Sequence, residues 1–212
     1  MLLALDTGNS DITLGVWNGK DWLHIWRIPS KPDEPEVFYG VKIRDLFLED
    51  NVPISEINTI VLSSVVPQLT EKLKNVVDVL FGKQAITLGP AIYKSLAVEV
   101  LNPYEIGSDL VSNAVAAYDH YKSACIVVDF GTALTFTTLS DRGSILGVSI
   151  TPGLKTAIKS LTQNTAKLFD VPLRMPSSAL GKNTITAIQS GILFGYSGLV
   201  QSMVGEIRKE IK

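Results

Sequence analysis

Two short aspartate–glycine segments have residue types and a spacing that could do chemistry. Asp6-Thr7-Gly8 follows an apolar run at the N-terminus, and Asp129-Phe130-Gly131 follows a second apolar run. A glycine in a turn leaves backbone N–H groups uncovered, and concave stretches of backbone amides bind anions, phosphate above all. We therefore expect the two turns to hold a polyphosphate between them. Each aspartate would lie beside the phosphates, where it can bind Mg²⁺, a water or a monovalent cation.

A simpler interpretation of each aspartate is that it caps its own tight turn through its side chain. The repetition favours phosphate binding, because Asp129 lies 123 residues after Asp6 and each aspartate ends an apolar strand that opens a hairpin. Other phosphate-binding patterns are missing from the sequence. It contains no G-x-x-x-x-G-K-[ST] loop, and no G-x-G-x-x-G that opens a helix after a strand.

The elements around the two turns repeat as well. Each turn belongs to a predicted unit of strand, turn, strand, turn and strand, with the strands expected at 1–5, 12–17, 22–28, 124–128, 134–139 and 145–150. Further strands are predicted at 57–66 and 84–88. Helical periodicity predicts helices at 36–50, 69–81, 108–121, 153–163 and 184–211, with Ser108 as an N-cap.

This pattern predicts an α/β fold built of two similar domains, residues 1–112 and 113–212, with mixed sheets and a cleft between them. Glycine turns that lead into a strand resemble the phosphate-binding hairpins of the actin, hexokinase and Hsp70 superfamily. The resemblance implies actin-like, ribonuclease H-like domains. The last predicted helix ends the sequence, so we expect the second domain to be truncated relative to such proteins.

Composition excludes several classes of protein. Hydrophobic residues make up 46% and charged residues 19% of the 212 residues, which is enough to bury a core. The formal net charge of −2 argues against nucleic acid or an anionic membrane as the main partner. One cysteine and two histidines argue against a zinc site. Without a signal-peptide pattern or a membrane-spanning apolar run, a cytoplasmic location is expected.

Several longer segments, in order along the chain, resemble those of type III pantothenate kinases. They are Asp6–Ser10, Ser63–Pro67, Asn102-Pro103, Gly107–Asp109, Asn113–Tyr118, Val127–Ala133, Pro152-Gly153, Gly181–Thr184 and Gln189–Gly191. The resemblance implies phosphorylation of pantothenate by ATP, the first step of coenzyme A biosynthesis. It also implies a homodimer that depends on Mg²⁺ and on a monovalent cation, K⁺ or NH₄⁺.

The resemblance also implies roles for individual residues. ATP phosphates would bind at the first turn, namely Asp6, Thr7, Gly8, Asn9, Ser10, Asp11, Ile12 and Thr13, and ATP would also contact Thr132. Pantothenate would contact Val100, Gly107, Ser108, Asp109, Leu110 and Thr184. Asp109 would be the catalytic base, Asp129 would hold the monovalent cation, and Asp6 would bind Mg²⁺. Asp109 and Thr184 each lie near a helix start, where a purely structural role is the simpler alternative.

Two positions depart from the family pattern. Leu110 stands where an arginine often follows the catalytic aspartate, and Val100 stands where a tyrosine often precedes Asn-Pro. A leucine cannot pair with the pantothenate carboxylate, so Lys94, Lys182 or a group from the partner subunit would have to supply the positive charge. Two other functions therefore stay open. One is a non-catalytic nucleotide-binding regulator, and the other is a kinase for another small hydroxy compound.

Overall fold

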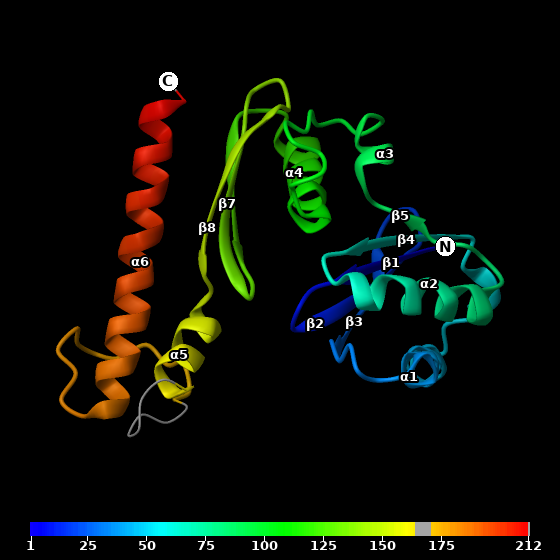
Figure 1. The fold of residues 1–212 in the computed structure, drawn as a ribbon, viewed down its shortest axis with the longest axis horizontal. Coiled ribbons are helices and arrows are strands. Elements are labelled where there is room, and N and C mark those ends of the chain that lie inside the picture. The colour runs from blue at the N-terminus through cyan, green and yellow to red at the C-terminus, as the bar shows by residue number, and fades with distance from the viewer. Residues whose placement is uncertain (164–170, 212) are drawn as a thin grey trace. The chain divides into compact units, whose positions relative to one another are not determined.

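Strand β1 (Leu2–Thr7) is the central strand of the first sheet in the computed structural model, which describes residues 1–163 and 171–211. It pairs antiparallel with β2 (Asp11–Trp17), and β2 pairs antiparallel with β3 (Trp22–Pro29). On its other side β1 pairs in parallel with β4 (Thr59–Ser64), and β4 pairs in parallel with β5 (Ile86–Thr87). The strand order is β3-β2-β1-β4-β5 (Figure 1), so this sheet is mixed, as predicted.

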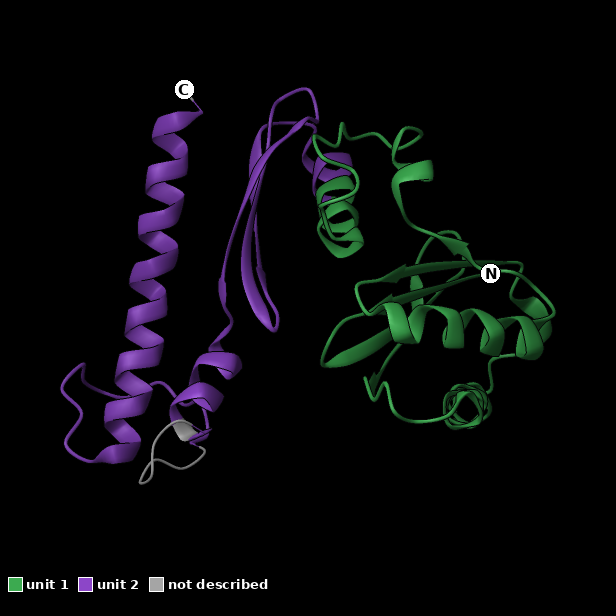
Figure 2. Cartoon of the chain, in the orientation of Figure 1, with its two compact units in different colours: residues 1–116 green, residues 117–212 purple. Residues whose placement is uncertain are grey.

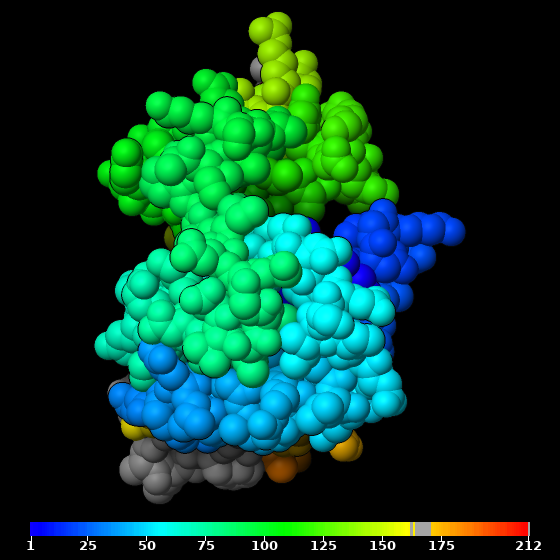
Figure 3. Space-filling view, turned by 90° about the vertical axis from the view of Figure 1, so that its right-hand side faces the viewer, coloured from blue at the N-terminus to red at the C-terminus, as the bar shows by residue number. Residues whose placement is uncertain are grey.

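Helices α1 (Glu36–Glu49) and α2 (Pro67–Phe81) cover one face of this sheet. Helix α1 buries Tyr39, Ile43 and Phe47, which recur every four residues and form one stripe. Helix α2 starts at a proline and ends at Gly82, whose φ of 62° suits a left-handed C-cap. In the space-filling view, residues of α1 and of the end of α2 lie at the surface of this part of the chain, together with the segments that connect the strands (Figure 3).

The opposite face of the sheet is left for other residues. Along β1 the side chains of Leu3 and Leu5 join the core with α1 and α2. Because side chains alternate along a strand, Ala4 and Asp6 point to the other face. The first unit also contains a 3₁₀ turn (Ile54–Glu56), helix α3 (Pro90–Tyr93) and the first half of helix α4 (Ser108–Tyr121).

The second sheet is a three-stranded antiparallel meander. It consists of β6 (Cys125–Phe130), β7 (Ala133–Leu139) and β8 (Ile145–Pro152). Helices α5 (Leu154–Gln163) and α6 (Thr184–Glu210) follow it and share a small core formed by Ile158, Val171, Ile188 and Ile192. Mixed pairing was expected in both sheets, but among the described residues this one has antiparallel pairs alone.

The chain divides into two compact units, residues 1–116 and 117–212 (Figure 2). Each unit contains the predicted strand–turn–strand–turn–strand motif. The two units meet within α4, whereas the sequence placed its domain boundary at 112/113. Both that boundary and the cleft between two domains stay predictions. Within the described part of the chain, no helix is long and apolar enough to cross a membrane.

Candidate active site

The parallel pairing of β1 and β4 brings polar side chains together on the open face of the first sheet. Asp6 stands opposite Thr13 of β2 in the antiparallel register and beside Ser63 of β4 in the parallel register. Directly opposed residues share a face of the sheet and lie roughly 5 Å apart at Cβ. Thr13, Asp6 and Ser63 therefore form one polar row across three strands.

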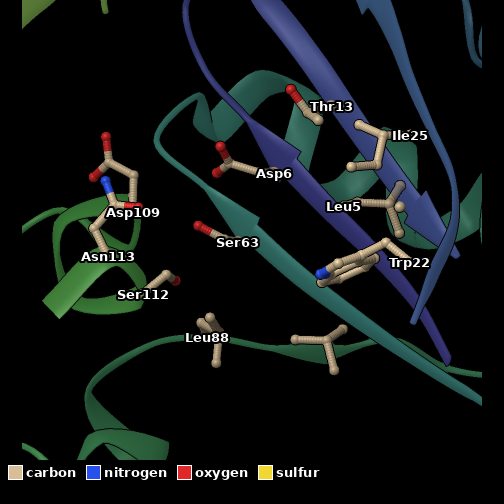
Figure 4. A pocket seen from close by; sticks show the side chains of 13 residues that line it. Leu5, Asp6, Thr13, Trp22, Ile25, Ser63, Leu88, Asp109, Ser112 and Asn113 are labelled. Atoms are coloured by element: carbon tan, nitrogen blue, oxygen red, sulfur yellow. The ribbon is translucent and has the colours of Figure 1, made fainter. Parts of the chain in front are cut away.

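A pocket of about 350 Å³ opens over this row, within residues 1–116. Asp109, Ser112 and Asn113 of α4 line it on the side that faces Asp6 and Ser63 (Figure 4). The remaining lining residues are Ala4, Leu5, Thr13, Gly15, Trp22, Ile25, Val61 and Leu88. Two carboxylates and several hydroxyl or amide groups thus converge on one hollow. Such convergence is typical of a small-molecule site.

A hydrogen-bonded hydroxyl pair fixes the start of α4 against the end of β4. Ser108 Oγ lies 3.0 Å from Ser63 Oγ, in a buried contact, and accepts from the backbone N–H of Ser64 at 3.1 Å. Thr70 Oγ1 donates to Ser64 Oγ at 2.8 Å and ties α2 to the same strand end. The residue before the catalytic candidate is therefore anchored to the strand that neighbours Asp6.

Ser108 does not act as the predicted N-cap. It is the first helical residue, and Gly107 precedes the helix, with its carbonyl accepting from the N–H of Val111. The Ser108 hydroxyl hydrogen-bonds to β4, where it accepts from the partly buried backbone N–H of Ser64. The resemblance implied that Ser108 contacts pantothenate. Its side chain is 6% exposed, so a contact through the backbone fits better than one through the hydroxyl.

Asp109 is held in the first turn of α4 by its surroundings. Its Oδ1 accepts from the backbone N–H of Leu110 at 2.8 Å. A Cβ at Gly107 would collide with the same carboxylate oxygen, so only glycine leaves room for this side-chain position. A negative charge here also interacts favourably with the positive end of the helix dipole.

Tyr93 of α3 lies in the same neighbourhood and is 4% exposed. Burial raises the pKa of its hydroxyl above the usual value, and the negative charge of Asp109 raises it further. The phenol therefore stays neutral at physiological pH. No motif in the sequence pointed to this residue.

The two departures from the family pattern lie away from the pocket lining. Leu110 is 8% exposed and is not among the residues that line this pocket, so its contact with pantothenate stays a prediction. Val100 is half-buried in the segment that precedes α4. Lys94 and Lys182 are both exposed, and either one as a partner for the pantothenate carboxylate stays a prediction.

The first turn itself is closed by its own backbone. The N–H of Gly8 donates to the carbonyl of Asp11 at 3.0 Å. Ser30, which follows β3, braces the turn by donating from its hydroxyl to the Gly8 carbonyl at 2.6 Å and from its N–H to the Ser10 carbonyl at 2.9 Å. Because the glycine amide is engaged, the amides that could reach a phosphate are those of the residues after it. No sequence pattern indicated the brace by Ser30.

The second turn has a matching construction in its own unit. The N–H of Gly131 donates to the carbonyl of Ala133 at 2.9 Å. The carbonyl of Thr132 accepts from the N–H of Gly153 at 2.9 Å and from Thr156 Oγ1 at 2.6 Å. A Cβ at Gly153 would collide with the Gly131 carbonyl. The family-like Pro152-Gly153 segment thus supports the turn that carries Thr132.

Asp129 and Thr184 occupy different parts of the second unit. Asp129 is half-buried on β6 and stands opposite Thr135 of β7. Thr184 is exposed at the first position of α6, after an N-cap in which the Asn183 side chain accepts from the N–H of Thr186 at 2.9 Å. That Asp129, Thr132 and Thr184 share one cleft with Asp6 and Asp109 stays a prediction.

The donor atoms fit the expected cations. Among the described residues, no group of three or more His, Cys, Asp or Glu side chains gathers as a metal cage. Mg²⁺ is commonly held by one or two carboxylates together with substrate phosphates, so Asp6 is sufficient on the protein side. Beside Asp129, Thr135 Oγ1 is buried without a hydrogen-bond partner in the described structure. Carboxylate and hydroxyl oxygens are suitable ligands for K⁺ or NH₄⁺.

The fold is similar to that of two solved structures with low sequence identity to this chain. One similar solved structure is a Campylobacter jejuni protein described as a Baf family transcriptional activator, with a TM-score of 0.54 and 22% identity, covering 94% of this chain and 78% of that one. Another is a Sinorhizobium meliloti protein described as a 2-dehydro-3-deoxygalactonokinase, with a TM-score of 0.53 and 14% identity, covering 84% and 63%. At these identities the likeness concerns the fold alone.

Sequence comparison narrows the class further. The model of the type III pantothenate kinase family matches residues 2–206. The type III pantothenate kinase of Syntrophobacter fumaroxidans (strain DSM 10017 / MPOB) is 39% identical over 212 residues, covering 100% of this chain and 82% of that protein. This chain belongs to the type III pantothenate kinase family, and the resemblance seen in its motifs is confirmed.

Proposed function

We propose that this chain transfers the γ-phosphoryl group of ATP to the terminal hydroxyl of pantothenate, giving 4′-phosphopantothenate and ADP. The observation that carries the proposal is the pocket in which Asp109 faces Asp6 and Ser63, in a chain of this family. The reaction is the first step of coenzyme A synthesis.

Asp109 is the proposed general base. Phosphoryl transfer passes through a loose transition state, so positioning and charge neutralisation supply most of the catalysis. Asp109 accepts a hydrogen bond from the pantothenate hydroxyl and takes its proton as the new O–P bond forms. The bond from the γ-phosphorus to the β–γ bridging oxygen breaks at the same time, and ADP leaves. Asp109 then returns the proton to solvent.

The positioning of Asp109 supports this role. Its neighbour Ser108 is bonded to Ser63 and Ser64, and Gly107 leaves space for the carboxylate. The two hydrogen bonds of Ser108 and the space left by Gly107 therefore hold the Asp109 carboxylate in position before either substrate binds. A base that is fixed before substrate binds does not have to be ordered during the reaction.

The first turn and Thr13 are the proposed phosphate-binding elements of the first unit, and Thr132 is the proposed ATP contact of the second. Asp6 would hold Mg²⁺, and Asp129 with Thr135 would hold K⁺ or NH₄⁺. When bound, these cations would neutralise charge on the phosphates. Val100, Gly107, Ser108, Leu110 and Thr184 remain the proposed pantothenate contacts. The pocket lining adds Asn113 as a candidate, because its amide lies beside Asp109 (Figure 4).

We further propose a homodimer in the cytoplasm. The family resemblance supports the dimer, and so do exposed apolar side chains on α6, where Ile185 is 42% and Phe194 38% exposed. The cytoplasm is where the proposed donor, ATP, is abundant. Light scattering of the purified protein tests the dimer, and a monomer at micromolar concentration would contradict it.

A coupled ADP-release assay, with and without pantothenate, tests the proposed reaction. Wild type is expected to release ADP when pantothenate is present, and Asp109→Asn to lose roughly 10²–10⁴-fold in kcat. Asp119→Asn is a matched control, because Asp119 lies on the same helix but pairs with Lys122 at the surface. It should retain wild-type activity.

Other outcomes would favour the alternatives. ATP binding without turnover under any condition would favour a non-catalytic regulator. ADP release that responds to a different hydroxy compound, and not to pantothenate, would favour another kinase. Turnover that ignores both pantothenate and Asp109→Asn would contradict the proposed mechanism.

A further inference from the structure

The pocket has an apolar end as well as a polar one. Two residues along the strands from Thr13, Asp6 and Ser63, the same face of the sheet carries a second row of residues. That row consists of Ile25, Gly15, Ala4 and Val61, which are aligned by the register of the four strands. Two residues along a strand span roughly 7 Å. An apolar row therefore runs parallel to the polar row, at a distance that one small molecule can bridge.

Trp22 closes the apolar end. Its ring lies against the backbone of Gly15, since a Cβ at that position would be 2.6 Å from Trp22 Cζ3 and 2.9 Å from Cε3. Trp17 packs against the same ring, with centroids 5.3 Å apart. Glycine at 15 thus lets an indole lie flat on the sheet. Gly15, which has no side chain, and the large indole of Trp22 together form one wall of the pocket.

This wall is not part of the folding core. Trp22 is 51% exposed and Ile25 63% exposed, whereas the core residues of the same strands are almost completely buried. An indole half in solvent contributes less to stability than a buried one, yet its ring borders a hollow that also contains Asp109 (Figure 4). A role in binding therefore accounts for the position of Trp22 better than a role in folding.

We propose that the apolar row and the Trp22 wall form a subsite for the dimethyl-substituted carbon of the acceptor, next to the hydroxyl that is phosphorylated. This inference rests on the proposed function, because it takes the acceptor hydroxyl to lie at Asp109. In pantothenate the quaternary carbon with two methyl groups is bonded directly to the CH₂OH group. With the hydroxyl in the polar row, the methyl groups point toward Ala4 and Gly15.

The subsite separates this acceptor from the polyhydroxy acceptors of sugar kinases. A sugar presents a hydroxyl at nearly every carbon, and the apolar row provides no side-chain hydrogen-bond partner for such groups. A hydroxyl buried without a partner loses binding energy, whereas methyl groups gain it on the same surface. Trp22 and Gly15 are thereby specificity-determining residues for an acceptor with a branched apolar carbon beside its reacting hydroxyl.

A comparison of two acceptors tests the subsite. One acceptor is pantothenate, and the other is 2,4-dihydroxybutyryl-β-alanine, which has hydrogens in place of both methyl groups. Wild type should prefer pantothenate by at least roughly tenfold in kcat/KM, the effect of a lost methylene in an apolar pocket. Trp22→Ala, which removes the wall, and Gly15→Ala, whose Cβ displaces the indole, should both reduce this preference to less than about threefold on the same scale.

Three controls sharpen the test. Trp22→Phe should retain most of the preference, because an aromatic ring remains. Leu23→Ala should retain all of it, since Leu23 is 45% exposed on the same strand but does not line the pocket. The KM for ATP should be unchanged in every variant.

The outcomes separate this inference from the proposed function. Calorimetric binding of both acceptors gives the preference without turnover. An undiminished methyl preference in both Trp22→Ala and Gly15→Ala would overturn the subsite, even in an active enzyme. A rise in the KM for ATP alone would also overturn it, by assigning the wall to the nucleotide. Methyl-dependent binding that needs Trp22, without ADP release, would support the subsite and contradict the kinase.

Discussion

The two hairpins carry the same motif in two different sheets. In both, an aspartate is the second-last residue of a strand, a glycine two residues later donates its N–H within the turn, and a threonine stands opposite the aspartate. The first hairpin contains β1, the central strand of a five-stranded sheet. The second contains β6, an edge strand of the three-stranded sheet that the described residues form.

The parallel neighbour of β1 accounts for the chemical difference. Strand β4 brings Ser63 beside Asp6, and Ser63 in turn fixes the start of α4, so that a second carboxylate faces the first. Asp129 is half-buried on an edge strand, opposite the Thr135 hydroxyl, for which the described residues provide no hydrogen-bond partner. We therefore expect the same motif to serve a phosphate-and-base site in the first unit and a small-cation site in the second.

Replacing the carboxylates of Asp6 and Asp129 one at a time should give the largest changes in activity. These variants test whether the first hairpin binds phosphates and the second binds a cation. Asp6→Asn should lower kcat by roughly 10²-fold at any K⁺ concentration, because a charge that organises the phosphates is lost. Asp129→Asn should instead raise the K⁺ concentration needed for half-maximal rate by roughly tenfold, as for a weakened metal site. Steady-state rates across K⁺ and Mg²⁺ titrations measure both. A K⁺ effect in Asp6→Asn but not in Asp129→Asn would reverse the assignment.

Two glycines offer a second contrast between the units. Gly107→Ala should displace the Asp109 carboxylate and lower kcat by roughly tenfold or more, with little change in stability, because a side chain can move aside. Gly153→Ala meets backbone carbonyls of the second turn, which cannot move aside, and should lower stability by roughly 1–3 kcal/mol. Thermal unfolding and the ADP-release assay separate the two effects. Equal loss of stability in both variants would contradict this contrast.

Buried hydroxyls give a third and smaller contrast. Ser63→Ala removes a partner of Ser108 Oγ and should cost roughly 1 kcal/mol of stability, with a decrease in kcat. Thr135→Val replaces a hydroxyl that has no hydrogen-bond partner among the described residues. At low K⁺ the substitution should therefore leave the free energy of unfolding unchanged or raise it. Denaturant unfolding with and without K⁺ measures this. Destabilisation by Thr135→Val in the absence of K⁺ would argue against a cation-ready hydroxyl.

Tyrosines give the smallest contrast, and it depends on pH. The pKa of Tyr93 is raised by burial and by the Asp109 charge, whereas burial alone raises that of Tyr196. A raised folded-state pKa stabilises the protein below the unfolded value of about 10, and this contribution is lost as pH rises through the folded value. Tyr93→Phe should therefore lose less stability than wild type above pH 10, and Asp109→Asn should reduce the Tyr93 effect. Unfolding at several alkaline pH values tests both variants.

Local sequence predicted most of the fold. Repeated aspartate–glycine turns located both hairpins, and apolar periodicity located α1, α2, α4, α5 and α6 to within a few residues. These features depend on neighbours along the chain, for which residue types and spacing are sufficient. Asp6 and Thr13, which the sequence assigned to ATP, line one pocket with Asp109, the expected base, whereas the expectation that Asp129 shares this groove stays a prediction.

Contacts between distant segments were not predicted. Ser63 and Ser108 are separated by 45 residues, and their hydroxyls meet because α4 begins against the end of β4. Ser30 and Tyr93 are further examples, since the residues that they affect, Gly8 and Asp109, lie 22 and 16 residues away along the chain. Ser108 was wrongly predicted as an N-cap for the same reason, because its partner lies on another element.

The most direct test of the central claim is a crystal structure of the protein with a non-hydrolysable ATP analogue, Mg²⁺ and pantothenate. The terminal hydroxyl of pantothenate should lie roughly 2.6–3.2 Å from a carboxylate oxygen of Asp109, with the γ-phosphate beside Asp6. A hydroxyl bound elsewhere, with Asp109 in contact with neither substrate, would contradict the account.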